Sequence, residues 1–451
     1  MTKLAISLIG PALKAGLSKV ELRPRIAAVV RHPQEHLDDP HFAGLARALH
    51  GPTTVSSFEE RDAPAPWHRF GGDDLDRASV QQLENACRLP IAVAGALMPD
   101  AHLGYGLPIG GVLATDGAVI PYAVGVDIAC RVKLTVLDLP PATLDKQPDR
   151  LVRAIESETR FGIGSQFTPQ RRDHDVMDED WSVSPVTRAY RDKAHAQLGT
   201  SGSGNHFIDF GVLTLDRDDL GLQAGQYLAM LTHSGSRGTG AAVCQHYSKI
   251  ARQRRAGLPK ELQHLAWLDL DSADGQEYWA AMQLMGKYAQ ANHALIHRHI
   301  ARHLGAAVLL DIENHHNFAW EETHSGKRVI VHRKGATPAD RGQVGIIPGS
   351  MAAPAYITRG KGLPESLNSA AHGAGRLMSR TQAKNTFHWN DVREHLKKRH
   401  VRVLSAGLDE VPFVYKDIDA VMAQQRDLVD VVARFDPRLV KMAPAGERAE
   451  D

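Results

Sequence analysis

The stretch from residue 91 to residue 139 constrains the fold of this chain more than any other segment. It reads IAVAGALMPDAHLGYGLPIGGVLATDGAVIPYAVGVDIACRVKLTVLDL, with short apolar runs separated by glycine and proline. These runs predict buried strands joined by tight turns, because they are too short for helices and are bounded by turn residues. The preceding segment 79–90, SVQQLENACRLP, has the spacing of an amphipathic helix that Pro90 ends.

The rest of the chain alternates between helical and strand-forming patterns. These patterns predict a helix and a loop within 19–39, charged helices over 145–200 with an exposed loop at 171–181, a turn-rich stretch at 199–211, an apolar strand at 226–238, long helices over 239–305, and strands with glycine turns over 308–360. No internal repeat, low-complexity tract or linker interrupts residues 64–442. We therefore expect one large α+β domain around a central cleft over 64–442, an N-terminal extension of unknown role over 1–63, and a polar tail over 443–451.

The composition argues against several classes of protein. The 451 residues carry a formal net charge of +1, so a polyanion has to be held by a local cluster of Lys and Arg. The three cysteines, Cys87, Cys130 and Cys244, form no close pair, which argues against a disulfide framework. The sequence has no run of about 18 apolar residues and no signal-peptide pattern. We expect a cytoplasmic protein with no membrane partner.

Four motifs place metal-ligating side chains at the ends of apolar segments, next to Gly, Ser or Asn. They offer Asp127 and Cys130 in GVDIACRV, Asn205 and His206 in GSGNHF, His233 in THSGSRG, and Glu313, His315, His316 and Asn317 in ENHHNFAW. A carboxylate, a thiolate and several imidazoles are the usual ligands of a transition metal, and a thiolate can bridge two ions.

Each of these residues also has an ordinary structural interpretation. A lone cysteine after an apolar strand often packs as a small hydrophobe, a histidine at a strand end is often only hydrogen-bonded, and a His-His-Asn run can cap a turn. Their shared position at strand ends favours a common site. The cysteine favours zinc by ligand softness, whereas triphosphate chemistry would suit manganese or magnesium, and the residues leave this choice open.

Four glycine-rich turns carry cations or hydroxyls that suit an anion. THSGSRG couples His233 to Arg237, VHRKGATPA offers Arg333 and Lys334, IIPGSM holds Ser350, and HGAGR lets the backbone approach closely after His372. Such turns are also common as plain surface loops. Four of them in one nearly neutral chain favour a phosphate site.

His372 lies in NSAAHGAGRLMSR, where alanine and glycine leave room for a large group beside the ring. A neutral imidazole can attack phosphorus, and attack on the α-phosphate of a nucleoside triphosphate would give a phosphoramidate. Arg376 and Arg380 follow at helical spacing. The alternative is a buried histidine that caps a helix starting at AGRLMSR.

Nine motifs, in this order, resemble those of the RtcB family of GTP-dependent RNA-splicing ligases. They are MPDAHLGYGLPIGG, GVDIAC, GSGNHF, HSGSRG, HHN, RKGA, GIIPGSM, HGAGRLMSR and YKDIDAVM. The resemblance covers residues 64–442. It implies an α+β RtcB-like fold and an enzyme that joins an RNA 3′-phosphate or 2′,3′-cyclic phosphate to an RNA 5′-hydroxyl, with GTP and two Mn²⁺ ions. The family's activity implies RNA splicing or RNA repair, and an activating protein partner is possible.

The resemblance also implies roles for individual residues. His372 would take GMP from GTP and pass it to the RNA 3′-phosphate, giving an RNA(3′)pp(5′)G intermediate that the 5′-hydroxyl attacks. The manganese ligands would be Asp127, Cys130, His206, His233 and His316, with Cys130 bridging two ions. The GTP contacts would be Asn205, His206, Phe207, Ile208, Asp209, His316, Asn317, Pro348, Gly349, Ser350, Met351, His372, Gly373, Ala374, Gly375 and Lys441. The RNA phosphate contacts would be Arg237, Lys334, Arg376 and Arg380.

The chain departs from the family pattern near the site. DINCGV of the family is DIACRV here, which puts Arg131 beside the metal cysteine, and the usual glutamate after NHF is Asp209. Ala352 follows PGSM in place of glycine, and Ala355 replaces a serine that contacts the nucleotide. These changes leave the metal ligands and the nucleophile intact and bear on nucleotide preference, as expected of a divergent paralogue.

Two other classes compete with the ligase. A metal-dependent phosphohydrolase acting on RNA ends would use the same metals and anion loops to activate water, without a covalent nucleotide. A non-catalytic RNA-binding paralogue would not need the intact ligand set and His372.

Overall fold

The computed structural model describes residues 9–50, 58–72, 75–168 and 170–447. Contacts divide the chain into two compact units, one formed by residues up to Phe58 with the short segment Gln253–Gly257, and one formed by all others. In the first unit, α2 (Gly10–Lys14), α3 (Lys19–Arg31) and α4 (Ala43–His50) pack around an apolar cluster that includes Leu22, Val29 and Phe42. The predicted helix within 19–39 is α3.

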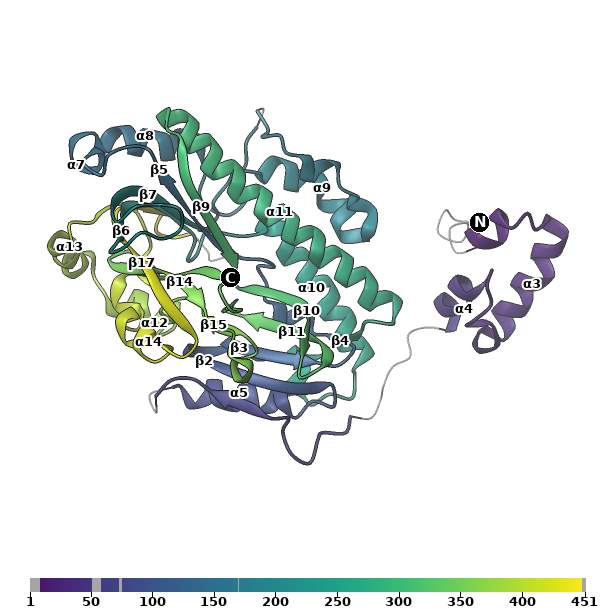
Figure 1. The fold of residues 1–451 in the computed structure, drawn as a ribbon. Helices are drawn as coiled ribbons and strands as arrows, with labels where there is room; N and C mark the ends of the chain where they lie inside the picture. The colour runs from purple at the N-terminus through teal and green to yellow at the C-terminus, as the bar shows by residue number, and fades with distance from the viewer. Residues whose placement is uncertain (1–8, 51–57, 73–74, 169, 448–451) are drawn as a thin grey trace. The chain divides into compact units, whose positions relative to one another are not determined.

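The second unit contains an antiparallel eight-stranded sheet (Figure 1). Its strand order is β13 (Val344–Ser350), β14 (Ala353–Gly360), β17 (Val429–Met442), β6 (Phe207–Leu215), β7 (Gly225–Ser234), β5 (Arg131–Leu137) and β9 (Val308–His315), and β16 (Arg402–Ser405) pairs with β17 in parallel. β5, β6 and β7 therefore lie side by side, which brings together three chain segments that carry predicted ligands.

The alternation of side chains along the strands separates two faces of this sheet. Val132, Leu134 and Val136 of β5 face one apolar cluster, whereas Leu137, Ile208 and Phe210 belong to a second cluster on the opposite face. The second face is covered by α8 (Pro148–Glu158) and by the long α11 (Ala273–Leu304), which crosses the sheet in Figure 1. We call it the helix side and the other the cavity side.

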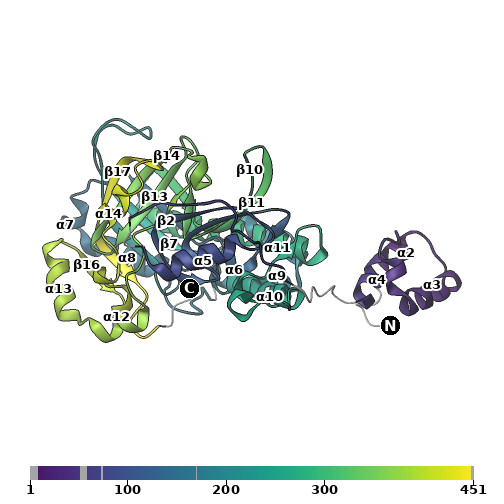
Figure 2. The same ribbon diagram turned by 90° about the horizontal axis from the view of Figure 1, so that it is seen from below.

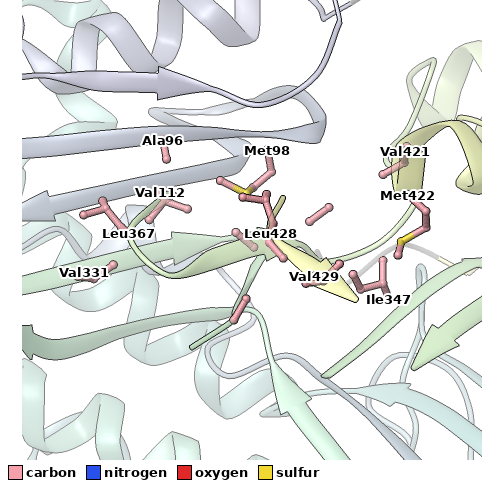
Figure 3. Close-up of a cluster of buried hydrophobic side chains, with 14 of the residues drawn as sticks. Ala96, Met98, Val112, Val331, Ile347, Leu367, Val421, Met422, Leu428 and Val429 are labelled. Atoms are coloured by element: carbon pink, nitrogen blue, oxygen red, sulfur yellow. The ribbon is translucent and has the colours of Figure 1, made fainter. Parts of the chain in front are cut away.

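A second, five-stranded sheet packs beside the first. Its strand order is β1 (Trp67–Arg69), β2 (Ala92–Tyr105), β3 (Leu107–Thr115), β11 (Lys327–Lys334) and β10 (Asn317–His324). Met98, Val112 and Val331 of this sheet meet Ile347 of β13 and Val421 of α14 (Ile418–Ala423) in one buried cluster (Figure 3). This cluster fixes the second sheet against the first.

The remaining elements connect and cover the two sheets (Figure 2). They are α5 (Arg77–Cys87), β4 (Ala118–Val119), α6 (Pro121–Val124), α7 (Thr143–Lys146), α9 (Pro185–Gln197), α10 (Arg237–Arg254), β8 (Leu268–Asp269), β12 (Ala336–Pro338), β15 (Ser369–Ala371), α12 (Arg380–Thr386) and α13 (Trp389–Lys398). None of the helices among the described residues is both long enough and apolar enough to cross a bilayer.

Most of the predicted elements are confirmed. α5 occupies the predicted helix at 79–90, and strands dominate 91–139, with α6 as the exception. The predicted exposed loop at 171–181 is wrong in part, because Val176, Met177 and Trp181 are buried beside α9 and α11. The predicted strand at 226–238 ends at Ser234, and α10 begins at Arg237.

Candidate active site

A cavity of about 700 Å³ opens in the second unit, within the size range of small-molecule sites. Its walls come from both sheets and from the loops after β15 and before β6. Asp127, Cys130, His233 and His316 line it, as does His372. Residues separated by more than two hundred positions in the sequence therefore line one cavity.

Five predicted metal ligands converge beside this cavity. Cys130 Sγ lies 3.0 Å from His233 Nε2 and 3.5 Å from His206 Nε2. His206 Nε2 lies 3.1 Å from Asp127 Oδ2, and His233 Nε2 lies 3.2 Å from His316 Nε2. Cys130 thus stands between a His206–Asp127 pair and a His233–His316 pair, and the atoms of Cys130, His206 and His233 lie close enough together to hold one ion.

The backbone fixes which ring nitrogens face the centre. His206 Nδ1 lies 2.9 Å from the Ser201 carbonyl and His233 Nδ1 lies 3.1 Å from the Asn205 carbonyl. A carbonyl only accepts, so both Nδ1 atoms carry the proton and both Nε2 atoms present a lone pair. His206 Nε2 and the Asp127 carboxylate are then two acceptors in contact, an arrangement that a cation between them would stabilise.

Burial keeps the His233 and His316 imidazoles uncharged. Desolvation is the largest cause that lowers the pKa of His233 to about 3, and burial together with neighbouring histidines lowers the pKa of His316 well below its usual value. Burial would raise the pKa of Asp127, but its contact with His206 and its hydrogen bonds to Cys130 and Ser236 outweigh it and lower that pKa. A neutral imidazole and an ionised carboxylate are the forms that bind metal.

Local backbone geometry brings Asp127 to this point. A Cβ added at Gly235 would lie 2.0 Å from Asp127 Oδ2, so only glycine fits there. The backbone N–H and hydroxyl of Ser236 donate to Asp127 Oδ1 at 2.9 and 3.1 Å. The serine and glycine of THSGSRG therefore hold the carboxylate in place.

His372 follows β15 and is held by the carboxylate of Asp100, which lies on β2 of the five-stranded sheet. Its Nδ1 lies 2.7 Å from Asp100 Oδ2, which also accepts the backbone N–H groups of His372 and Gly373 at 3.1 and 3.3 Å. Asp100 is fully buried, whereas the His372 side chain is 17% exposed and lines the cavity. The His372 ring lies 4.9 Å from the His316 ring, centroid to centroid, which sets it beside the metal-ligating cluster.

Most of the predicted nucleotide contacts line the same cavity. Those that do are Asn205, Phe207, Asp209, His316, Asn317, Pro348, Gly349, Ser350, Met351, His372, Gly373, Ala374 and Gly375. Asn205 Oδ1 and Asp209 Oδ1 are buried without a hydrogen-bond partner, and burial raises the pKa of Asp209 well above its usual value.

Two predicted nucleotide contacts lie on the helix side instead. Lys441 and Ile208 are cross-strand partners on β17 and β6, so they share a face. Ile208 packs in the apolar cluster under α8 and α11, and Lys441 Nζ lies 3.1 Å from Glu156 Oε1 of α8. Neither is among the residues that line the cavity, whereas the neighbours of Lys441, Val440 and Met442, are.

The four predicted phosphate-binding cations have different surroundings. Arg237 and Lys334 line the cavity, and Lys334 Nζ donates to the Tyr105 carbonyl at 2.7 Å. Burial lowers the pKa of Lys334 to about 8. Arg376 and Arg380 pair with Asp409 and Glu410, and only Arg376 lines the cavity.

Comparisons with known proteins identify the family of the chain. The family model described as tRNA-splicing ligase RtcB matches residues 82–184 and 172–442. The chain belongs to the RtcB family. It is 36% identical over 400 residues to the RNA-splicing ligase RtcB of Escherichia coli strain K12, a match that covers 80% of this chain and 93% of that protein. The tRNA-splicing ligase RtcB of Archaeoglobus fulgidus is 33% identical over 440 residues, covering 80% of this chain and 88% of the relative.

The departures from the RtcB pattern have structural consequences. Arg131 points to the helix side, where it donates to Glu313 Oε1 at 3.2 Å and to the Gly286 carbonyl at 3.0 Å, so it does not enter the metal cluster. Ala129 adopts a φ of +59°, a left-handed conformation that asparagine tolerates better than alanine. Loss of the family's asparagine therefore leaves a strained residue before Cys130.

Sequence reasoning missed Asp100. It lies in MPDAHLGYGLPIGG, a motif that resembles the family but to which the resemblance assigns no residue role. An aspartate after an apolar strand is a weak signal, because its partner is 272 positions away. The alternative, a helix starting at AGRLMSR, is excluded: α12 begins at Arg380, and a Cβ at Gly375 would lie 2.1 Å from the Asp100 carbonyl oxygen.

Proposed function

We propose that this protein is a GTP-dependent RNA ligase that joins RNA 3′-phosphate or 2′,3′-cyclic phosphate ends to 5′-hydroxyl ends through a guanylylated His372. Its relatives are named RNA-splicing and tRNA-splicing ligases. The observation that carries the proposal is the Asp100–His372 pair beside the five converging ligands. A hydrolase would need the ligands but not a positioned nucleophile.

Asp100 would prepare His372 for attack. Because the carboxylate accepts the Nδ1–H of the ring, the lone pair stays on Nε2. Nε2 would attack the α-phosphorus of GTP, an N–P bond would form, and the P–O bond to the β-phosphate would break as pyrophosphate leaves. The positive charge that develops on the ring would be stabilised by the Asp100 carboxylate.

Two further transfers would complete the ligation. An oxygen of the RNA 3′-phosphate would attack the guanylyl phosphorus, which breaks the N–P bond and restores neutral His372. The 5′-hydroxyl of the second RNA would then attack the 3′-phosphorus, lose its proton, and release GMP. A 2′,3′-cyclic phosphate would first be opened by water.

The donor set fits a transition metal, and Asp127, Cys130, His206, His233 and His316 would hold it. The family implies manganese, in two ions bridged by Cys130; when bound, the ions would neutralise the triphosphate and RNA phosphate oxygens. Arg237 and Lys334 are the cavity cations best placed to hold RNA phosphate. We propose Asn205 and Asp209 as nucleotide contacts, because their unpartnered oxygens border the cavity.

Labelling with nucleotide tests the proposal. The purified protein is incubated with Mn²⁺ and α-³²P GTP, then denatured and separated by electrophoresis, with His372→Ala in parallel. We expect an acid-labile labelled band that the variant lacks. An unlabelled wild-type protein that still processes RNA ends would refute the ligase and favour the phosphohydrolase.

A further inference from the structure

A second concave surface lies away from the catalytic cavity. It is a groove of about 730 Å³ between α13 and β16, which Figure 2 shows side by side. We call it the α13 groove; its lining residues include Trp389, Arg393, Lys397, Arg402 and Arg438. Among the described residues that line it, none is Asp or Glu.

The groove is strongly basic in an almost neutral protein. From Trp389 to Arg402 the chain has five Lys and Arg against two acidic residues, whereas the whole chain has a net charge of +1. Arg402 pairs with Asp149 at 3.3 Å and Arg438 with Asp145 at 2.8 Å, and both aspartates are largely exposed. Exposed pairs of this kind are weak, so a phosphate can replace either carboxylate at little cost.

One face of α13 combines stacking and charge. Trp389, Arg393 and Lys397 are spaced four residues apart, so they form one stripe along the helix. Trp389 is half-buried, and Arg393 and Lys397 are exposed. An aromatic face beside cations is the arrangement that binds single-stranded nucleic acid, where bases stack on the ring and phosphates meet the cations.

The groove and the cavity share one apolar cluster. Leu396, Val401 and Ala406 of this cluster line the groove, while Met351, Tyr415, Val440 and Met442 of the same cluster line the cavity. A strand whose end reacts in the cavity therefore has a basic surface on the other side of the same apolar cluster.

We propose that the α13 groove binds the body of a single-stranded RNA whose end lies in the cavity. This inference rests on the proposed function for the identity of the polyanion. The groove contributes affinity for the strand and takes no part in nucleotide transfer.

A matched pair of double variants tests the groove. Arg393→Gln/Lys397→Gln neutralises two groove cations, and Lys398→Gln/Arg399→Gln removes the same charge at the end of α13, from residues that do not line the groove. Binding of fluorescent single-stranded RNA of about 20 nucleotides is measured by anisotropy without GTP over a range of salt concentrations. A dinucleotide with the same 3′-phosphate serves as the short probe.

We expect the groove variant to bind the long RNA about 10-fold more weakly, with a salt slope smaller by about 1.4, because each lost phosphate contact accounts for about 0.7. Its affinity for the dinucleotide and the extent of His372 guanylylation stay at the wild-type level. The control variant changes the affinity for long RNA less than twofold. Trp389→Leu keeps an apolar side chain in the cluster. It should weaken binding of the long RNA about fivefold or more, because stacking on the indole is lost.

Equal RNA affinity and equal salt slope in the two double variants would overturn the proposal. Poly-glutamate serves as a probe for an acidic protein partner. If the groove variant loses poly-glutamate binding but binds RNA as the wild type does, the proposal is overturned in favour of such a partner. If the wild type is not guanylylated but the groove variant still binds the long RNA more weakly than the wild type, the groove proposal stands and the proposed ligase function fails.

Discussion

Two groups of buried histidines lie on opposite faces of the same strands. His206, His233 and His316 form a metal-side cluster against the cavity, and His293 and His297 of α11 form a helix-side cluster under the sheet. Burial is the largest cause that lowers the pKa of His233, His316, His293 and His297. Burial and neutrality therefore do not distinguish the two clusters.

Hydrogen bonding does distinguish them. On the helix side, Thr135 donates to Asp311 at 2.5 Å and receives the Nδ1–H of His297 at 2.6 Å, so His297 Nε2 accepts from Thr232 at 2.8 Å. The hydroxyls of Thr135 and Thr232 therefore pair both ring nitrogens of His297. On the metal side, backbone carbonyls accept hydrogen bonds from the Nδ1–H groups of His206 and His233. The Nε2 atom of His206 then faces the Asp127 carboxylate, and that of His233 faces the Cys130 thiol.

The comparison shows that histidine burial alone does not indicate a metal site. Threonine hydroxyls, which can both donate and accept, satisfy both nitrogens of His297, and a histidine held in this way is structural. The contact of His206 Nε2 with Asp127 Oδ2 instead brings a lone pair against a carboxylate oxygen, and a cation between the two atoms would stabilise it.

Replacing a metal-side ligand should show the largest difference in Mn²⁺ affinity between the two clusters. We expect His233→Ala to weaken Mn²⁺ binding by more than about 100-fold and to abolish guanylylation, because it removes a lone pair from the centre of the cluster. Calorimetry with Mn²⁺ alone measures the affinity.

His297→Gln is the matched helix-side control. It should reduce stability and leave Mn²⁺ affinity within about threefold, since its partners are hydroxyls. Equal loss of Mn²⁺ affinity in the two variants would remove the distinction between the clusters.

Asp100→Asn should lower the rate of guanylylation by about 100-fold or more. The amide can donate to Nδ1 and so favour the tautomer with its proton on the attacking Nε2. Single-turnover labelling at saturating GTP and Mn²⁺ measures the rate. Asp311→Asn, which alters the carboxylate beneath Thr135, should leave that rate unchanged, and a wild-type rate in Asp100→Asn would exclude the positioning role.

Alternation along strands explains which site residues sequence reasoning could predict. The resemblance implies one continuous nucleotide contact from Asn205 to Asp209, but β6 turns Phe207 and Asp209 to the cavity and Ile208 to the helix side. The sequence could predict that Cys130, just before β5, and His233, near the end of β7, lie close together, because strand ends meet at one edge.

Long-range pairs explain what the sequence could not supply. The Asp100–His372 contact joins two sheets, and the ion pairs of Arg376 and Arg380 with Asp409 and Glu410 depend on how the chain returns after α13. The helical spacing of the two arginines suited the alternative helix at AGRLMSR, but Gly375 adopts a φ of +74°, which a right-handed helix excludes. The local sequence pattern around His372 and the two arginines carries no information about these distant carboxylates.

Acid should destabilise the protein through its buried neutral histidines. An unfolded histidine has a pKa of about 6.5, so below that pH the unfolded state binds more protons and the free energy of unfolding falls. Replacing His297 by glutamine should reduce this slope by up to about 1.4 kcal/mol per pH unit. Urea unfolding between pH 7 and pH 4, in steps of about half a unit, measures it.

His332→Gln provides the calibration. Burial lowers the pKa of His332 to about 4, so its contribution to the slope should be confined to the window between about 6.5 and about 4. An unchanged slope in both variants would show that these histidines titrate normally in the folded protein.

Ala129→Asn should give the smallest effect. Alanine at a φ of +59° is strained, and asparagine should raise the free energy of unfolding by about 0.5–1 kcal/mol. Thermal unfolding without metal measures the gain. Ser325→Asn, at a φ of +50° in the exposed turn between β10 and β11, is a control for the same relief away from the site, and a loss of stability in Ala129→Asn would contradict the strain.

The most direct test of the two-cluster account is an anomalous diffraction map of crystals soaked in Mn²⁺, recorded at the manganese edge. The account predicts density on both sides of Cys130 Sγ, between His206 and Asp127 and between His233 and His316, and no density beside His293 or His297. Density absent around Cys130, or present at the helix-side histidines, would contradict it.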